Sequence, residues 1–96
     1  MKKFQATIHF EMDDEFMSHI PEHREYISGL IRKGVIDQYL VSMESQRVWI
    51  TFTAENKEDV EEHLGKSPIH KYWTYEIDEL FLIDGQHYRL PALQMN

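Results

Sequence analysis

Cysteine is absent from this chain of 96 residues. Its absence excludes disulfides, thiolate metal sites and cysteine nucleophiles together, and it fits a reducing compartment. An apolar run long enough to span a membrane is also missing. The N-terminal stretch MKKFQATIHF alternates apolar and polar residues, whereas a signal peptide needs a continuous apolar core. We therefore expect a cytoplasmic protein.

Basic residues are scarce, with 10 Lys and Arg against 17 Asp and Glu, so the net charge is −7 at pH 7. A surface of this sign repels phosphate backbones and anionic membranes, which argues against nucleic-acid and membrane partners. The composition, 42% hydrophobic and 28% charged, is that of a globular chain. The length predicts one domain over residues 1–96, and we find no internal repeat.

The first third of the chain changes from a strand pattern to a helix pattern. Apolar and polar residues alternate from Phe4 to Phe10, as in a half-buried strand. EMDDEFMS follows and is interpreted as a polar connection. A stripe at helical spacing then contains Phe16, Ile20, His23, Ile27, Leu30 and Ile31. It predicts a helix over roughly residues 19–33, with Ser18 as its N-cap and Gly34 as its C-terminal stop.

The remaining segments predict a hairpin, a second helix and a last strand. VIDQYLVSM and RVWITFTA are rich in β-branched and aromatic residues and are separated by a short polar turn. Asn56 is the expected cap of the next helix, which Gly65 ends. WTYEIDELFLI is the last strand. Because both of its faces are partly apolar, the sequence does not decide which face points into the core. Residues 84–96 form a tail that we expect to pack on a partner subunit.

The predicted order, β-α-β-β-α-β, is that of a ferredoxin-like α+β fold. Four strands form an antiparallel sheet, and two helices cover one of its faces. The other face carries Gln5, Thr7, His9, Glu11, Trp49 and Thr51. Because a tryptophan is costly to leave in water, this face is expected to meet a second sheet. Two facing sheets make a dimeric α+β barrel, a homodimer or higher homo-oligomer with a pocket between the sheets.

Several segments resemble a known family. IHFEMDD, the helix end RKG, the stretch RVWITFTAENKEDVEEHL and SPIHKYWTYEIDEL are similar to muconolactone isomerase and its small relatives. His9, Met12 and Asp13 match that family's His and Met-Asp pair at the end of the first strand, and the Ser67–Ile69 turn with Tyr72 looks similar as well. The resemblance covers roughly residues 4–82. Glu11 departs from it, because the family has an arginine there.

The resemblance implies a dimeric α+β barrel and a cofactor-independent isomerisation by proton transfer. Such work needs an acid or base close to the substrate, and it requires neither a cofactor nor a metal. Glu11, in the place of the family's arginine, argues against the same lactone carboxylate as substrate. The function predicted first is therefore a small-molecule isomerase that resembles muconolactone isomerase and acts in the pocket between two sheets.

His9 and Glu11 are the strongest candidate pair. Strand alternation places both on the pocket face, roughly 6.5–7 Å apart. The hypothesis makes His9 the base or acid and Glu11 or Asp13 its orienting partner. The candidate substrate-binding residues are Thr7, Arg47, Trp49 and Thr51. The alternatives are a histidine on a solvated strand face and a tryptophan that packs in a dimer interface.

Two other functions fit the same fold. The barrel could bind a small metabolite or act as an accessory subunit without catalysis, or it could be a cofactor-free oxygenase. A metal site at His19 and His23 is disfavoured, since Pro21 distorts that turn and His23 belongs to the apolar stripe. Asp13, Asp14 and Glu15 show no calcium-loop pattern and are interpreted as a solvated turn.

Overall fold

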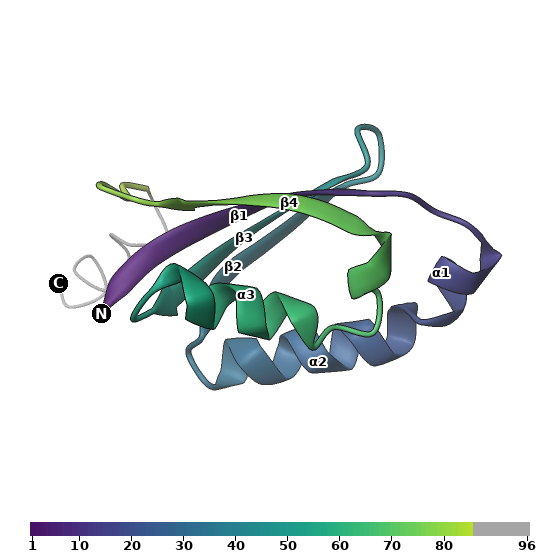
Figure 1. Ribbon diagram of the computed structural model, residues 1–96, viewed down its shortest axis with the longest axis horizontal. Helices are drawn as coiled ribbons and strands as arrows, with labels where there is room; N and C mark the ends of the chain where they lie inside the picture. Colours follow the sequence, from purple (N-terminus) through teal and green to yellow (C-terminus); the bar gives the residue numbers. More distant parts are fainter. Residues whose placement is uncertain (86–96) are drawn as a thin grey trace, which may run out of the picture.

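The computed structural model describes residues 1–85 as one sheet covered on one face by helices (Figure 1). The four strands are β1 (Lys2–Phe10), β2 (Ile36–Ser42), β3 (Arg47–Ala54) and β4 (Trp73–Glu79). They pair antiparallel in the order β2-β3-β1-β4. The helices are α1 (Asp14–Ser18), α2 (Ile20–Arg32), α3 (Lys57–Gly65) and the short 3₁₀ helix η1 (His70–Tyr72). The ferredoxin-like α+β fold is confirmed.

The core lies between the sheet and helices α2 and α3. Alternate residues of the two central strands point into it and are buried: Phe4, Ala6, Ile8 and Phe10 from β1, and Val48, Ile50, Phe52 and Ala54 from β3. Ile27 and Leu30 of α2 and Val60 and Leu64 of α3 cover them. The buried alternate residues of the strands and the apolar stripes of the helices therefore pack against each other in one apolar layer, as predicted.

The inward face of β4, which the sequence left open, follows from its pairing with β1. Trp73 lies opposite Phe10, Tyr75 opposite Ile8 and Ile77 opposite Ala6, so the aromatic residues of β4 face the helices. The strand ends at Glu79, earlier than predicted, although the Leu80 N–H still donates to the Lys3 carbonyl at 2.8 Å. Phe81 and Leu82 lie beyond the sheet and are exposed.

The connection predicted after β1 was wrong in part, because it contains the additional helix α1. The Asp13 carboxylate accepts the Phe16 N–H at 2.7 Å and so caps this helix. Ser18 is its last residue and not the N-cap of α2; its hydroxyl donates to the Glu15 carbonyl. His19 precedes α2 without a side-chain cap, and Pro21 occupies the first turn, where its missing N–H costs nothing.

The helix ends and the apolar stripe agree with the sequence in most positions. Asn56 caps α3 by accepting the Asp59 N–H at 2.9 Å. Gly34 has a φ of +78°, the left-handed backbone that favours glycine after a helix. Ile31 was wrongly included in the buried stripe. It follows Leu30 by one residue, points away from the sheet and is 46% exposed.

The predictions of a C-terminal tail and of no membrane-spanning segment can be compared with the described residues. Of the tail predicted over residues 84–96, residues 86–96 lie outside the described part of the chain. Within residues 1–85, the helices are all too short and too polar to cross a bilayer.

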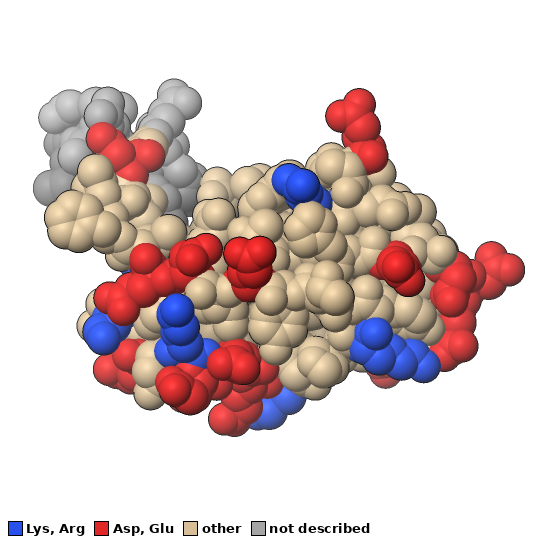
Figure 2. Space-filling view, turned by 45° about the horizontal axis from the view of Figure 1, so that its top comes forward, with Lys and Arg blue, Asp and Glu red and all other residues tan. Residues whose placement is uncertain are grey.

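Acidic side chains gather along the edges of the face in Figure 2, and the middle of that face is largely uncharged.

The packing predicts different costs for the same change at two isoleucines. Ile50→Ala removes a fully buried side chain from the centre of the sheet, and we expect it to lower the free energy of unfolding by about 3 kcal/mol. Ile31→Ala is the matched control on an exposed helix position and should cost less than about 1 kcal/mol. Urea unfolding followed by circular dichroism measures both, and equal losses would contradict this assignment of the core.

Candidate functional site

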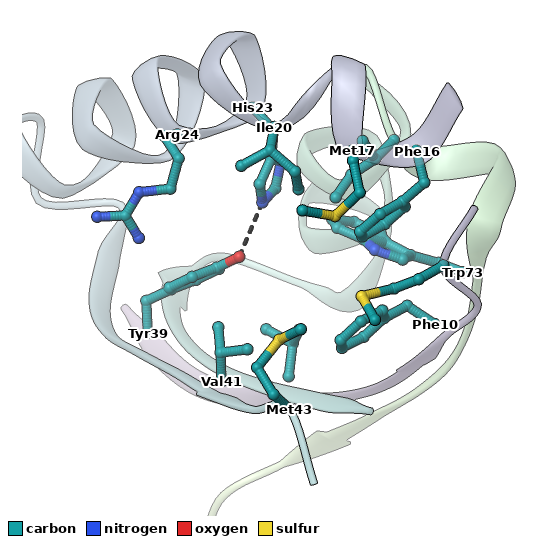
Figure 3. Close-up of a pocket in the computed structure, with 13 residues that line it drawn as sticks. Phe10, Phe16, Met17, Ile20, His23, Arg24, Tyr39, Val41, Met43 and Trp73 are labelled. Carbon is teal, nitrogen blue, oxygen red and sulfur yellow. Dashed lines mark hydrogen bonds between the residues drawn. The ribbon is translucent and has the colours of Figure 1, made fainter. Parts of the chain in front are cut away.

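A cavity of about 250 Å³ opens between the helices and the end of the sheet (Figure 3). Six elements contribute to it: the C-terminal ends of β1 and β2, the start of β3, helix α1, the first turns of α2 and the start of β4. Most of its lining is apolar, including Phe10, Phe16, Met17, Ile20, Val41 and Met43. A concave apolar space with few polar groups is the usual form of a small-molecule site.

Helix α1 forms one wall of this cavity through aromatic contacts. The rings of Phe16 and Phe10 stack with centroids 5.4 Å apart, and Tyr72 meets Phe16 edge-on at 5.3 Å. Outside the cavity, Lys71 Nζ donates to Glu15 Oε1 at 2.7 Å and joins α1 to η1. Because that ion pair is solvent-exposed, the aromatic packing contributes more to holding α1 in place.

His23 is the central polar group of the site and is almost completely buried. Its Nδ1 lies 2.8 Å from Ser67 Oγ, and its Nε2 lies 2.8 Å from Tyr39 Oη. The Ile69 N–H donates to the same serine oxygen at 3.2 Å. Both ring nitrogens are thus hydrogen-bonded, and one imidazole links α2, the turn after α3 and β2.

Burial keeps both His23 and Tyr39 neutral. It lowers the pKa of His23 to about 4, and the nearby Arg24 cation acts in the same direction. Burial raises the pKa of Tyr39 to about 12, although Arg24 partly opposes that change. At neutral pH the site therefore contains a neutral imidazole between two hydroxyl groups, with the tyrosine hydroxyl at the cavity wall (Figure 3).

This chain of hydrogen bonds can be arranged in two ways. When Ser67 donates to Nδ1, the Nε2–H donates to Tyr39, and the tyrosine proton is left for a ligand. When the His23 Nδ1–H donates to Ser67, the Tyr39 hydroxyl donates to Nε2 and can only accept a hydrogen bond from a ligand. The tautomer of His23 thus decides whether the cavity wall presents a donor or an acceptor.

Two more hydrogen-bond donors line the cavity. The indole N–H of Trp73 is buried and has no hydrogen-bond partner among the described residues. Arg24 is exposed and lines the cavity on the side of Tyr39, with its guanidinium turned away from the other lining residues, and Trp73 lies on the far side (Figure 3). Within residues 1–85, no ion pair involves Arg24. Because the Trp73 N–H is inaccessible and the Arg24 guanidinium is exposed to water, the Tyr39 hydroxyl is the polar group that this cavity offers a ligand most directly.

The four residues predicted as substrate-binding lie together with His9, the predicted catalytic base or acid, on the opposite, open face of the sheet. Pairing of β1 with β3 sets His9 opposite Arg47 and Thr7 opposite Trp49, and Thr51 follows opposite Gln5. His9 and Arg47 are exposed, Thr7 and Trp49 are half-buried, and Thr51 is buried. Strand alternation therefore places these five side chains on one face, as the sequence predicts.

The proposed partners of His9 lie beyond the strand. Glu11 shares with it a more polar depression of about 270 Å³, lined also by Lys71, Tyr72 and Thr74. Asp13 does not line this depression, and its carboxylate caps α1 instead. Phe10 and Trp73 line both hollows and separate the depression from the apolar cavity.

Sequence reasoning assigned no role in a site to Tyr39, Ser67 or Trp73, and it placed His23 in the apolar stripe. The signal that could have found the cavity is that same histidine, because a buried imidazole requires hydrogen-bond partners. Their identity depends on segments that are distant in the chain. Among the described residues, no group of three or more His, Asp or Glu side chains is arranged to hold a metal ion.

A scan of the chain against models of known protein families finds no match. A search of curated proteins likewise finds no relative.

His23 predicts a pH dependence of stability. Its pKa is about 4 in the folded protein, against 6.5 for the unperturbed group, so the unfolded chain takes up the proton at the higher pH. The stabilisation is complete above pH 6.5 and is lost as the pH falls toward 4. We expect a loss approaching about 3 kcal/mol across this range in urea unfolding experiments.

Two variants separate this effect from general acid unfolding. His23→Gln should lose most of the pH dependence between 6.5 and 4, whereas His9→Gln, which changes an exposed histidine on the open face, should keep it. If both variants show the slope of the unchanged protein, the buried imidazole is not its cause.

Proposed function

We propose that the protein binds a small, mostly apolar molecule with a carbonyl or carboxylate group in the cavity between α2 and the sheet. The observation that carries this proposal is the combination of apolar walls with the Tyr39 hydroxyl, which is free to donate in one tautomer of His23. The exposed Arg24 lies beside Tyr39 at the edge of the cavity and adds a positive charge there.

The size of the cavity limits the ligand. Its 250 Å³ is the share of roughly eight water molecules in the liquid, near the lower end for ligand pockets. A single ring with a short side chain fits this volume better than a dinucleotide or a fatty acid. Apolar walls bury the ring, and the donors orient the acceptor group.

A proton-transfer isomerase, as the resemblance to muconolactone isomerase implies, is the second candidate. The hydrogen-bonded chain of Ser67, His23 and Tyr39 favours it. When the His23 Nε2–H donates to Tyr39, the tyrosine hydroxyl can donate to a carbonyl oxygen and stabilise the negative charge that forms there as a water molecule takes the proton of the adjacent carbon. The described lining contains no carboxylate, and both His23 nitrogens are already hydrogen-bonded, so Tyr39 and His23 polarise the carbonyl and do not act as the base.

The open face of the sheet remains the alternative location. Thr7, Arg47, Trp49 and Thr51 would line a pocket there only after a second sheet covers them, as the proposed dimeric barrel requires, whereas His9 already lines the depression that contains Glu11. The helix–sheet cavity needs no such cover to exist. This difference supports the cavity as the primary site, and it makes the two locations separable by mutation.

Binding of three related probes tests the proposal. Cinnamate has a carboxylate, benzylideneacetone has a neutral carbonyl, and propenylbenzene has neither. We expect the two acceptor-bearing probes to bind more tightly than the hydrocarbon in calorimetric or NMR titrations. Tyr39→Phe should weaken benzylideneacetone up to about tenfold, the effect of one hydrogen bond. Arg24→Gln should weaken cinnamate more than the ketone, because only cinnamate is charged.

The control is His9→Ala, which changes the open face and leaves the cavity intact. It should bind all three probes as the unchanged protein does. If His9→Ala abolishes binding while Tyr39→Phe has no effect, the site is on the open face of the sheet. Thermal unfolding of each variant shows whether a loss of binding reflects a loss of the fold.

A further inference from the structure

We propose that Ser67 holds His23 in its Nε2–H tautomer and so makes Tyr39 a hydrogen-bond donor toward the cavity. Ser67 does not line the cavity. It is therefore a positioning residue, which acts on a ligand only through the imidazole and the tyrosine. The inference rests on the proposed function, because it names the residue that selects the ligand class of that same cavity.

The hydrogen bonds of Ser67 leave one group to be placed, its hydroxyl proton. The backbone N–H of Ser67 donates to the Leu64 carbonyl at 3.2 Å, and its carbonyl accepts the His70 N–H at 3.1 Å. The hydroxyl oxygen accepts the Ile69 N–H at 3.2 Å and lies 2.8 Å from His23 Nδ1. Within residues 1–85, no other group is hydrogen-bonded to this hydroxyl. Its proton therefore has one available acceptor there, the Nδ1 lone pair.

The two tautomers of His23 differ in how they treat this proton. In the Nε2–H tautomer, Nδ1 accepts the Ser67 proton and Tyr39 accepts the Nε2–H, so every polar atom of the imidazole and the serine hydroxyl is paired. In the Nδ1–H tautomer, the serine oxygen accepts N–H groups from His23 and Ile69, and its own proton has no partner among the described residues. Because Ser67 is buried, an unpaired proton there is unfavourable. The hydrogen bonds therefore select the Nε2–H tautomer.

This tautomer fixes what Tyr39 offers a ligand. The tyrosine oxygen accepts the His23 Nε2–H, with 2.8 Å between Oη and Nε2, so the tyrosine proton is left over. Figure 3 shows this hydrogen bond at the cavity wall. A ketone or carboxylate oxygen can accept the tyrosine proton, whereas a ligand that carries donors alone cannot use it. The cavity should therefore prefer acceptors, and the cause lies in a serine outside it.

Two substitutions of nearly equal size separate the direction of the Ser67 hydrogen bond from its packing. Asparagine and aspartate in place of Ser67 can both accept the Ile69 N–H, because their side chains commonly bond to the backbone two residues on. With one oxygen used in this way, Ser67→Asn turns its amide N–H toward Nδ1, whereas Ser67→Asp presents only lone pairs. A carboxylate beside Nδ1 holds the proton on that nitrogen. We therefore expect the Nε2–H tautomer in Ser67→Asn and the Nδ1–H tautomer in Ser67→Asp.

NMR of ¹⁵N-labelled protein shows the tautomer directly, because protonated and unprotonated ring nitrogens have well-separated chemical shifts. The signals of His23 are identified by their absence from His23→Gln. A neighbouring carboxylate raises the pKa of an imidazole, so the spectra are recorded above neutral pH, where the ring of Ser67→Asp is also neutral. The unchanged protein should have a protonated Nε2 and an unprotonated Nδ1. A protonated Nδ1, or an equal mixture of the tautomers, in the unchanged protein overturns the proposal.

Binding of two probes under the same conditions gives a second readout. Benzylideneacetone can only accept a hydrogen bond, and indole donates through its N–H and has no acceptor oxygen. Ser67→Asp should weaken benzylideneacetone up to about tenfold, as expected of Tyr39→Phe, and should not weaken indole. Ser67→Asn should bind both probes about as tightly as the unchanged protein does. An equal loss of both probes in Ser67→Asp, or the same loss of the ketone in Ser67→Asn, contradicts the role of Ser67.

The two readouts distinguish a failure of this inference from a failure of the proposed function. If the unchanged protein has the Nε2–H tautomer but binds neither probe, the proposed ligand site is wrong and the role of Ser67 stands. If benzylideneacetone binds while His23 carries its proton on Nδ1, the role of Ser67 is wrong and the proposed ligand site stands.

Discussion

The pair of hydrogen bonds at His23 is the constraint on which the rest of the site depends. An imidazole in an apolar layer is tolerated only when both nitrogens have partners, and these come from Ser67 and Tyr39. The partners belong to a turn and a strand that are far from α2 in the sequence. One side chain therefore helps to set the distances between the helix, the turn and the sheet. These distances in turn set the width of the cavity beside it.

The cavity itself results from the way the helices cover the sheet. Helices α2 and α3 pack over the centre of the sheet, where Ile50 and Phe52 are completely covered. Near the end of β1 the cover passes to α1, a helix of only five residues. Such a short element cannot fill the space with side chains of its own, so Phe16 covers Phe10 and leaves a hollow toward Tyr39. The open volume lies where the helical layer is thinnest.

The sequence was informative wherever a local period or a cap decides the structure. Alternation in β1 and β3, the Asn56 cap and the βαββαβ order follow from residues that are neighbours in the chain. Helix α1 was missed because one cap at Asp13 and one buried apolar residue, Phe16, give no periodicity. The cavity was missed because its polar group depends on His23 meeting Ser67, 44 residues away. The predicted open-face set does share one face, since strand register alone places it.

Phe10 and Trp73 form a partition one side chain thick between the apolar cavity and the polar depression that contains His9. A substitution at Phe10 or Trp73 therefore changes the lining of both hollows at once. Only variants of residues that line a single hollow, such as Tyr39 or His9, can assign a bound molecule to one of them.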